Sequence, residues 1–561
     1  MKRFIHPKDP RYIFLQGSPK EMNGLTKHLN KVPLYQLLPS YHGQISPEVF
    51  LDEIPGKDAY YCSSGLWREV DEWCQEKRFS IDPMPKDAKY TKFDISKEDF
   101  RTLVLSWGLT PTPRDYQIDA AWMILKYKYS LSELATRAGK TLIFYIVSRA
   151  AMELLGVKKI LMIVPSIHLV RQGVEDLEGY QEFFKTEQVW AGGESVSTAN
   201  LTIGTFQSLV LRADPRSKKY DPDYFSGFDL VCVDECHKLP CRSIRTILAN
   251  PHFRDVKLRF GFTGTLPKRN TIEWFSCQAL MGPKIQTIEA RELIDEGYLA
   301  EPVIHQIRLS YTDDYTAHVI RCAEYLVSNY VMEGGSKALL PKELREGTMI
   351  YKKTLPVAVQ QSKDLLPQEG YMNFLIDLCK DASQALVLEQ MVAQRSWGKL
   401  QALREILQGT EKNVIVFAHN TEYIKYIADE IADIKKVFTI TGSKTLKNRQ
   451  KVVDQLAEQD GCVLIGSYGC VGTGLTFKNI HSGVFLQSFK SDIITRQSLG
   501  RLMLRQEGKT EFDLYDIIDI FPTKKIYSQG LQKIRSYEEQ GFSHTVDTRK
   551  VLFNKQNTLS L

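Results

Sequence analysis

One stretch of the sequence carries residues that could hold a phosphate group. The segment LATRAGKT (134–141) ends in Gly139, Lys140 and Thr141, as phosphate-binding loops do. If a helix begins there, its backbone N–H groups would hold phosphate oxygens. Lys140 would then bring its charge to the β- and γ-phosphates, and Thr141 would ligate Mg²⁺. The first glycine of such a loop is missing, however, and Arg137 lies in the middle. The stretch alone leaves open both a nucleotide site and a chance Gly-Lys-Thr.

An acidic pair further along the chain would complete a hydrolytic site. Asp234 and Glu235 follow the apolar run LVCV. Asp234 would hold Mg²⁺, usually through water, and Glu235 would orient or deprotonate the attacking water. Two acids at a strand end are often only solvated. The order Asp-Glu-Cys-His, downstream of Lys140, favours hydrolysis of a nucleoside triphosphate.

The same segment offers zinc binding as an alternative. Cys232, Cys236, His237 and Cys241 lie close in sequence, and Cys and His are the ligands of structural zinc. However, Cys232 lies inside the apolar run, and the acidic motif explains Cys236 and His237 better. The ten cysteines are scattered singly, and the sequence has no secretory leader and no apolar run of membrane length. We therefore expect reduced thiols in a cytoplasmic protein.

Strands must bring these residues together. From about residue 111, short apolar runs alternate with helix-length segments. Such runs are typical of parallel sheets covered by helices, where ligands bind at the carboxyl ends of the strands. We therefore predict an α/β fold. The runs are KKILMIVP (158–165), DLVCVDE (229–235), KLRFGFTG (257–264), NVIVFA (413–418), CVLIGS (462–467) and GVFLQS (483–488).

The runs fall into two groups, and residues 312–392 between them lack this rhythm. At 561 residues, with 43% hydrophobic and 25% charged residues, the chain is long enough for several globular domains. We predict five parts. They are a small α+β N-terminal nucleic-acid-binding domain (1–100), an ATP-binding α/β domain (101–305), a helical insert (306–395), a second α/β domain (396–525) and a tail (526–561).

Further motifs in the first α/β domain resemble those of superfamily 2 helicases. The matching segments are TPRDYQIDAA, IVPSIHLVRQ, IGTFQSL and FTGT, together with DECH. The resemblance implies two RecA-like motor domains in tandem. It assigns ATP binding to Tyr116, Gln117, Thr136, Arg137, Ala138, Gly139, Lys140 and Thr141. It assigns coupling to His237, Thr263, Gly264 and Thr265. It assigns nucleic-acid contacts to Pro165, Ser166, Arg171, Thr205, Gln207 and Ser208.

The second α/β domain carries three more segments of this resemblance, TGSKTLKNRQ, SYGCVGTGLTFKNI and QSLGRLMLR. They imply nucleic-acid contacts by Gly442 and Arg449. They further imply ATP binding by Gly472, Thr473 and Gly474, and catalysis by Gln497, Arg501 and Arg505 beside Glu235. An arginine from one domain would complete the site of the other, so that hydrolysis becomes motion.

Two positions depart from the family pattern. Arg137 stands where glycine is usual, so the loop must hold arginine in an ordinary conformation or accept strain. In the last motif Leu504 occupies the place of the second arginine, which is shifted to Arg505. One residue turns a helix by about 100°, and Arg505 would reach a phosphate only if the backbone adjusts. Arg501 is the better candidate for the arginine finger.

The segments DECH, SYG-x-x-x-TG and DLYDIID resemble phage helicases of branch migration and fork rescue, as does SSGLWREVDEWCQEKRFSIDP near the N-terminus. This resemblance implies an ATP- and Mg²⁺-dependent DNA helicase that acts on forks, Holliday junctions or R-loops in recombination. A double-stranded DNA translocase or restriction-type motor stays open, as do an RNA helicase and a clamp that has lost hydrolysis. A net charge of +6 permits a polyanionic partner without requiring one.

Two groups of residues outside the motor motifs could also touch nucleic acid. Aromatic side chains in the first hundred residues could stack on exposed bases, although packing in a core is the commoner role. In the basic C-terminal region, Lys524, Lys525, Lys533 and Arg535 could contact a phosphate backbone, or form a solvated helical face.

Overall fold

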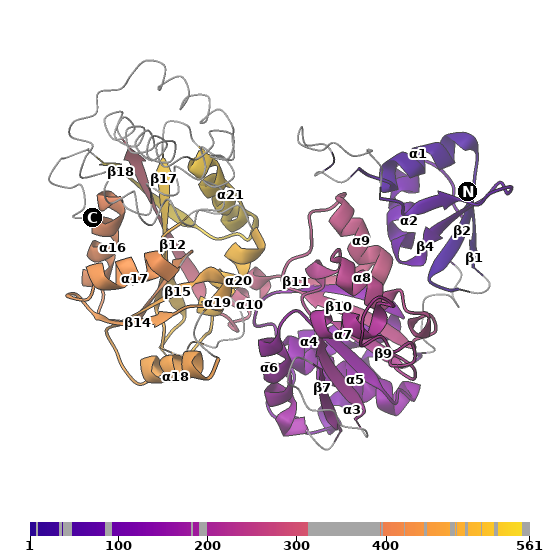
Figure 1. Cartoon of the computed structure of the whole chain (residues 1–561), viewed down its shortest axis with the longest axis horizontal. Coiled ribbons are helices and arrows are strands. Elements are labelled where there is room, and N and C mark those ends of the chain that lie inside the picture. Colours follow the sequence, from indigo (N-terminus) through magenta and orange to yellow (C-terminus); the bar gives the residue numbers. More distant parts are fainter. Residues whose placement is uncertain are drawn as a thin grey trace, which may run out of the picture. The chain divides into compact units, whose positions relative to one another are not determined.

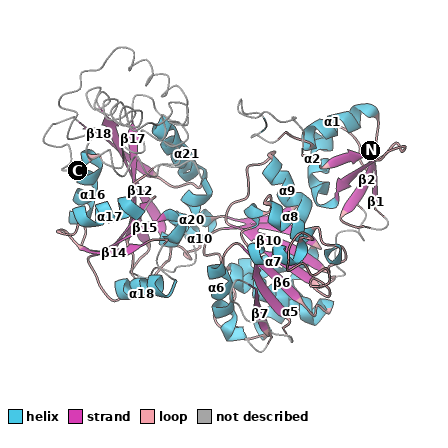
Figure 2. Cartoon of the chain, in the orientation of Figure 1, coloured by secondary structure: helices cyan, strands magenta, loops and turns pink. Residues whose placement is uncertain are grey.

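The computed structural model divides the chain into two compact units, Met1–Glu289 and Ala290–Leu561. Figures 1 and 2 show the elements of each unit. Among the residues described, no helix has both the length and the apolar character needed to cross a membrane. The structure describes residues 1–6, 9–32, 36, 48–84, 93–180, 183–189, 199–311, 393, 396–419, 421–442, 446–471, 477, 479–487, 492–506, 508–520 and 525–551.

The N-terminal part of the first unit is a small antiparallel sheet in the order β1-β2-β4-β3. Its strands alternate, so that Ile13, Leu15 and Cys62 point into the core while Phe4 and Tyr12 point outward. Its elements are β1 (Lys2–Ile5), β2 (Tyr12–Gln16), α1 (Pro19–Leu29), β3 (Leu51–Glu53), β4 (Tyr60–Ser63), the 3₁₀ turn η2 (Ser64–Leu66) and α2 (Trp67–Glu76).

The aromatic residues of this sheet divide between the two predicted roles. Trp73 is buried in the shared core. Phe4, Tyr12 and Tyr61 stay exposed, by 50%, 37% and 37%. Packing therefore accounts for Trp73, and stacking on bases stays a prediction for the three exposed rings.

The N-terminal sheet is docked on the motor. Glu69 of α2 is buried, and its Oε1 accepts hydrogen bonds from Trp274 Nε1 (3.0 Å) and Gln278 Nε2 (2.9 Å). Gly65 approaches so closely that a Cβ there would lie 1.9 Å from the Gln278 carbonyl oxygen. Buried apolar residues of both parts belong to one core. The sheet is therefore part of the first unit.

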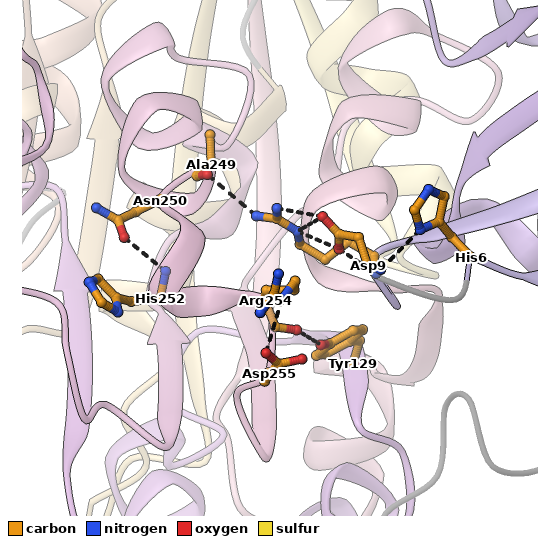
Figure 3. Close-up of polar contacts among 9 residues, drawn as sticks. His6, Asp9, Tyr129, Ala249, Asn250, His252, Arg254 and Asp255 are labelled. Atoms are coloured by element: carbon orange, nitrogen blue, oxygen red, sulfur yellow. Dashed lines mark hydrogen bonds and ion pairs between the residues drawn. The ribbon is translucent and has the colours of Figure 1, made fainter. Parts of the chain in front are cut away.

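A second contact joins the turn between β1 and β2 to the motor (Figure 3). Asp9 accepts hydrogen bonds from Arg11 and donates its backbone N–H to His6 Nδ1 (3.0 Å). Arg11 Nη1 in turn donates to the carbonyl oxygen of Ala249 (3.4 Å).

The motor sheet of the first unit has seven described strands, all parallel, in the order β11-β5-β10-β9-β6-β8-β7. The strands are β5 (Tyr129–Leu134), β6 (Ile160–Val164), β7 (Thr186–Val189), β8 (Leu201–Thr205), β9 (Leu230–Val233), β10 (Leu258–Thr263) and β11 (Lys284–Ile288). The helices are α3 (Lys97–Ser106), α4 (Asp115–Lys126), α5 (Lys140–Leu155), α6 (Ile167–Leu177), α7 (Phe206–Ala213), α8 (Arg242–Leu248) and α9 (Ile272–Met281), with the 3₁₀ turns η4 (Glu178–Tyr180), η5 (Cys236–Lys238) and η6 (Pro251–Phe253).

The second unit has its own sheet of seven described strands, again parallel, in the order β14-β15-β13-β16-β17-β12-β18. The strands are β12 (Glu301–Tyr311), β13 (Val414–Ala418), β14 (Lys436–Ile440), β15 (Cys462–Ser467), β16 (Ser482–Phe485), β17 (Glu511–Ile520) and β18 (His544–Val551). The helices are α10 (Ala290–Asp295), α16 (Trp397–Gln408), α17 (Thr421–Glu430), α18 (Leu446–Ala457), α19 (Tyr468–Val471), α20 (Asp492–Leu502) and α21 (Lys525–Glu539). The two sheets confirm the predicted tandem α/β architecture.

Two predicted boundaries need correction. We predicted that the first α/β domain continues to residue 305, but β12 pairs with β17 and β18 of the second sheet. We also predicted a separate tail from residue 526, but α21 and β18 are part of the second unit. Both errors concern strands on one side of the second sheet, β12 and β18, whose partners lie far away in sequence. The helical insert predicted at 306–395 falls mostly on residues 312–392, outside the described residues.

Neither role considered for Lys533, a phosphate contact or a place on a solvated helical face, agrees with the structure. Lys533 is 2% exposed and forms an ion pair with Asp516 of β17. Tyr537 donates its hydroxyl to the other oxygen of Asp516 (3.0 Å). A lysine held in this way serves the packing of α21 on the sheet. Lys524 lies outside the described residues.

A second buried ion pair joins α16 to β17. Lys399 Nζ lies 2.6 Å from Asp519 Oδ2, and both side chains are 1% exposed. Tyr311 donates its hydroxyl to Asp519 Oδ1 (2.6 Å). Burial lowers the pKa of Lys399, and the Asp519 carboxylate opposes that shift. Removing one partner would leave the other charge buried without compensation.

We predict that Lys399→Ala lowers the free energy of unfolding by about 3–5 kcal/mol, because Asp519 then stays buried unpaired. The double variant Lys399→Met/Asp519→Leu should cost less than the single one. The matched control is Arg404→Ala, which breaks the exposed pair with Asp433 and should cost less than about 1 kcal/mol. Urea denaturation measures all three. Equal effects of the two single variants would contradict the prediction.

Candidate nucleotide site and nucleic-acid interface

Three neighbouring strands bring the predicted nucleotide-binding residues to one edge of the first sheet. β10 lies between β5 and β9, and all three run parallel. Thr263 pairs with Glu133, and Gly261 pairs with Val233. Because parallel strands end at the same edge, the phosphate loop after β5, the coupling motif at the end of β10 and the acids after β9 come together.

The phosphate loop is braced from α4. Its carbonyl oxygen at Ala138 accepts hydrogen bonds from Tyr116 Oη (3.1 Å) and Gln117 Nε2 (3.0 Å). Gln117 Oε1 accepts the backbone N–H of Arg114 (2.9 Å). Gly139 has φ +80°, and a Cβ there would lie 2.2 Å from Gln117 Nε2. Gln117 thus braces the loop through both ends of its amide, and its assignment to ATP binding stays a prediction.

The backbone of Arg137 is strained, which is one of the two expectations for an arginine at this position. Its φ is +70°, in the left-handed region that arginine rarely adopts. Such a conformation costs of order 1–3 kcal/mol and persists only where the surroundings fix it. The loop thus keeps its shape without glycine at this position, and Lys140 begins α5 as predicted.

The acidic pair follows β9 in a second strained turn. Glu235 has φ +52°, and its backbone N–H donates to Asp234 Oδ1 (2.9 Å). Burial and then the Glu235 carboxylate raise the pKa of Asp234 to about 6, and Lys140 opposes this shift. A buried carboxylate whose negative charge is only partly offset by a neighbouring lysine is suited to binding a divalent cation. Asp234 and the Thr141 hydroxyl are oxygen ligands of the kind Mg²⁺ takes beside water and phosphate.

His237 connects the acidic pair to the coupling motif. Its Nδ1 lies 2.9 Å from Thr263 Oγ1 and 3.2 Å from Glu235 Oε2. The Thr263 hydroxyl also accepts the backbone N–H of Thr265 (3.2 Å). A Cβ on Gly264 would meet its neighbours at ordinary contact distances, of which the closest is 3.6 Å, to Thr136. The structure therefore brings the predicted coupling residues together.

The zinc alternative lacks support in the structure. Cys232 and Cys236 are buried in the apolar core. In the part of the chain that the structure describes, no group of three or more His, Cys, Asp or Glu side chains could hold a metal ion. Cys236 and His237 instead serve the core and the coupling contact.

Sequence reasoning missed Asp176. Thr141 Oγ1 donates a hydrogen bond to Asp176 Oδ2 (3.3 Å), and Gln172 Nε2 lies 3.5 Å from the same oxygen. Asp176 lies near the end of α6, the helix that carries the predicted nucleic-acid contacts Ser166 and Arg171. Through Asp176 the predicted metal ligand Thr141 is thus tied to that helix. No local motif marks this residue, because the contact depends on how α6 packs beside α5.

The predicted nucleic-acid contacts lie at two neighbouring helix N-termini. β6 and β8 are adjacent, so α6 and α7 begin at the same edge of the sheet. Ser166 Oγ accepts the N–H of Leu169 (3.4 Å), and Thr205 Oγ1 accepts that of Ser208 (3.3 Å). Gln207 Nε2 donates to the carbonyl oxygen of Pro165 (3.2 Å). Helix N-termini attract phosphates. Arg171, on the same helix as Ser166, is exposed.

In the second unit, the structure places some of the predicted residues. Gln497 and Arg501 lie four residues apart on α20 and so share one face of the helix. Arg449 Nη2 donates to the carbonyl oxygen of Gly442 (3.2 Å). Gly472, Thr473 and Gly474 lie outside the described residues.

The structure does not support catalysis by Arg505. Helix α20 ends at Leu502, and Leu504 forms an antiparallel bridge with Leu299. Arg505 Nη1 donates to the carbonyl oxygen of Gly297 (2.7 Å). The guanidinium therefore joins the end of the motif to the segment after α10. The predicted catalytic role required the backbone to adjust, and in this structure the backbone after Leu502 directs the guanidinium to Gly297.

Known proteins share this arrangement of motifs. Residues 110–268 match the family described as type III restriction enzyme, res subunit, and residues 398–503 match the helicase conserved C-terminal domain. The chain is an ATP-dependent helicase of superfamily 2. It is similar to the ATP-dependent DNA helicase uvsW of Enterobacteria phage T4, with 24% identity over 86% of this chain and 87% of the relative.

Two further comparisons agree with this family. The DNA 3'-5' translocase XPB2 of Sulfurisphaera tokodaii is 23% identical over 80% of this chain and 88% of the relative. The solved structure of the type ISP restriction-modification enzyme LlaBIII bound to DNA matches 78% of this chain and 31% of that chain, with 13% identity and a TM-score of 0.50. The latter likeness shows the fold of the helicase motor.

We predict that Arg137→Gly is more stable than Arg137→Ala by about 1 kcal/mol. Both variants lose the guanidinium, but alanine keeps the strain of a left-handed backbone and glycine does not. The glycine variant also loses more chain entropy on folding, which limits the gain. Thermal denaturation of the two variants measures the difference. Equal melting temperatures would show that residue 137 is not held at positive φ.

We also predict that Asp176→Ala raises the Mg²⁺ concentration needed for half-maximal hydrolysis by about 10-fold, because Thr141 loses the group that orients its hydroxyl. Asp176→Asn keeps an acceptor and should have a smaller effect. Nucleotide binding without Mg²⁺ should stay unchanged. Glu175→Ala, one residue away, is the control. If Asp176→Ala behaves like Glu175→Ala, the contact has no role in metal binding.

Proposed function

We propose that this helicase hydrolyses ATP with Mg²⁺ in order to remodel branched DNA, by branch migration, fork regression or dissociation of R-loops. The observation that carries hydrolysis is the contact of His237 with both Glu235 and Thr263 beside the phosphate loop. This geometry supports a centre in which the acid that activates water is tied to the coupling motif.

Each side chain of the centre has a role in this proposal. Lys140 would bind the β- and γ-phosphates, and Thr141 and Asp234 would hold Mg²⁺, which would offset the charge on the phosphates. Glu235 accepts the proton of the water whose oxygen attacks the γ-phosphorus, while the bond from that phosphorus to the β,γ-bridging oxygen breaks and ADP leaves with the electron pair. Arg501 stabilises the negative charge that develops, and Gln497 contacts the nucleotide. Arg505 is left out of this set because its guanidinium contacts Gly297.

The substrate is inferred from the relatives and from the helix N-termini. The phage T4 relative is a DNA helicase and the archaeal one a DNA translocase. Backbone N–H groups and hydroxyls at the starts of α6 and α7 suit phosphates, so we expect binding with little sequence preference and strong dependence on salt. The residues proposed to contact DNA are Pro165, Ser166, Arg171, Thr205, Gln207, Ser208, Gly442 and Arg449.

Branched DNA is favoured over plain translocation by the similarity to the phage T4 helicase over most of both chains. The alternative is a double-stranded DNA translocase, favoured by the match to the restriction-enzyme family over residues 110–268. The two functions differ in whether strands exchange partners while the motor moves.

We predict that the purified chain separates a four-way DNA junction into two duplexes when ATP and Mg²⁺ are present. Glu235→Gln should bind the junction as well as the wild type does, yet separate it about 10²–10⁴-fold more slowly, because the general base is lost. Gel electrophoresis of labelled junctions measures both. A parallel assay follows the displacement of a third strand from a triplex. Triplex displacement with intact junctions would favour the translocase.

A further inference from the structure

The segment that follows the coupling motif is held at both ends. Leu266 comes directly after Thr265, and its backbone N–H donates to Glu133 Oε1 (3.0 Å). Glu133 is the strand partner of Thr263 and stands shortly before the phosphate loop. Its other carboxylate oxygen lies 3.4 Å from Lys284 Nζ. The coupling motif and the strand that leads to the phosphate loop are therefore joined by one carboxylate.

The other neighbour of this segment is the N-terminal sheet, through helix α2. Glu72 of α2 forms an ion pair with Arg269, three residues after Leu266. Arg68 of α2 donates to the carbonyl oxygen of Lys284 (2.9 Å) and to Tyr127 Oη (3.1 Å). These contacts reach Arg269, at the end of the segment 266–269, and Lys284, whose ammonium lies 3.4 Å from the Glu133 carboxylate.

A cavity of about 290 Å³ lies between α2 and the segment 266–269. It is lined by Arg68, Glu72, Glu133, Pro267, Arg269 and Lys284 among others. Leu266, at the start of the segment 266–269, is buried in the shared core, whereas Arg269, at its end, is exposed and borders the cavity. The ion pair with Glu72 is the contact from α2 that holds this end of the segment.

These contacts form a continuous path to the catalytic acids. From α2 the path runs through Arg269 to the segment 266–269, and from there to Thr265. Thr265 donates its N–H to Thr263, whose hydroxyl lies against His237, and His237 contacts Glu235. The step from Arg269 to Thr265 follows the backbone, and the other steps are direct contacts within the first unit. A change in how α2 sits would shift the segment that fixes Thr263 and His237.

We propose that the N-terminal sheet is a positioning element of the motor, and that Glu72 and Arg68 of α2 hold the coupling segment in the arrangement that lets nucleic acid stimulate hydrolysis. This inference rests on the proposed function, because it concerns the same hydrolytic site. It assigns Glu72, Arg68 and Glu133 no contact with ATP or DNA.

Charge reversal of the Glu72–Arg269 pair tests the inference. Both side chains are about half exposed, 50% for Glu72 and 58% for Arg269, so breaking the pair should change stability little. Glu72→Arg and Arg269→Glu should each lower the DNA-stimulated rate of ATP hydrolysis about 3–30-fold. The rate without DNA should stay within about twofold of the wild type. The double variant Glu72→Arg/Arg269→Glu should recover the stimulation.

Glu76→Arg is the matched control. Glu76 lies one turn further along α2, and its ion pair within the described residues is with the exposed Lys77. The proposal predicts no effect of this change on stimulation. It is overturned if Glu72→Arg and Glu76→Arg behave alike, or if both single reversals reduce stimulation and the double variant does not restore it.

Amide hydrogen exchange separates this inference from the proposed function. The Leu266 amide should exchange faster in Glu72→Arg and Arg269→Glu than in the wild type, and should be protected again in the double variant. Faster exchange in a chain that DNA does not stimulate would overturn the proposed function and support the positioning contact. Normal stimulation in the wild type with unchanged exchange in both single variants would overturn the positioning contact alone.

Discussion

The pairing of β10 between β5 and β9 is the constraint on which the site depends. The apolar residues of these three strands are buried, because helices cover both faces of a parallel sheet and exclude solvent. A shift of one residue would turn each side chain to the opposite face of the sheet. The register is therefore strongly fixed by the core. As a consequence, one edge of the sheet carries the phosphate loop, the coupling motif and the acidic pair. The strand pairing alone brings them there.

Backbone strain gathers at the same edge. Arg137 and Glu235 are two of the described non-glycine residues with positive φ, and each stands shortly after a buried strand. Such conformations cost free energy and need surroundings that fix them. For Arg137 the support comes from the hydrogen bonds that Tyr116 and Gln117 make to Ala138. For Glu235 it comes from Asp234 and His237. The strained turns point loop residues outward from a rigid sheet.

The sequence was most informative where a local motif follows a buried strand. Gly139 to Thr141, the acidic pair and Thr263 all lie where strand ends predicted them. The sequence was less informative about contacts between elements far apart in the chain. Asp176 meets Thr141, and Glu133 meets Leu266, through packing that no local pattern encodes. Arg505 shows a third limit, because the end of α20 depends on a bridge between Leu504 and Leu299.

The domain boundaries failed for a related physical reason. β12 has an alternating pattern that a strand of either sheet could show, and its place is decided by pairing with β17 and β18. The N-terminal sheet likewise looked separable, yet buried Glu69 and the close approach of Gly65 dock it on the motor. A buried carboxylate is costly to leave without its hydrogen-bond donors, and both donors to Glu69, Trp274 and Gln278, belong to the motor. The N-terminal sheet is therefore best regarded as part of the motor unit that carries the site.

The measurement that tests this account most directly is the rate of phosphate release from ATP by the purified full-length chain, over a titration with branched DNA. The account predicts slow release without DNA, a rate that rises to saturation as DNA is added, and no release when Mg²⁺ is omitted. DNA binding at every concentration with no phosphate release would contradict it, and would mean that the phosphate loop with Arg137 does not support hydrolysis.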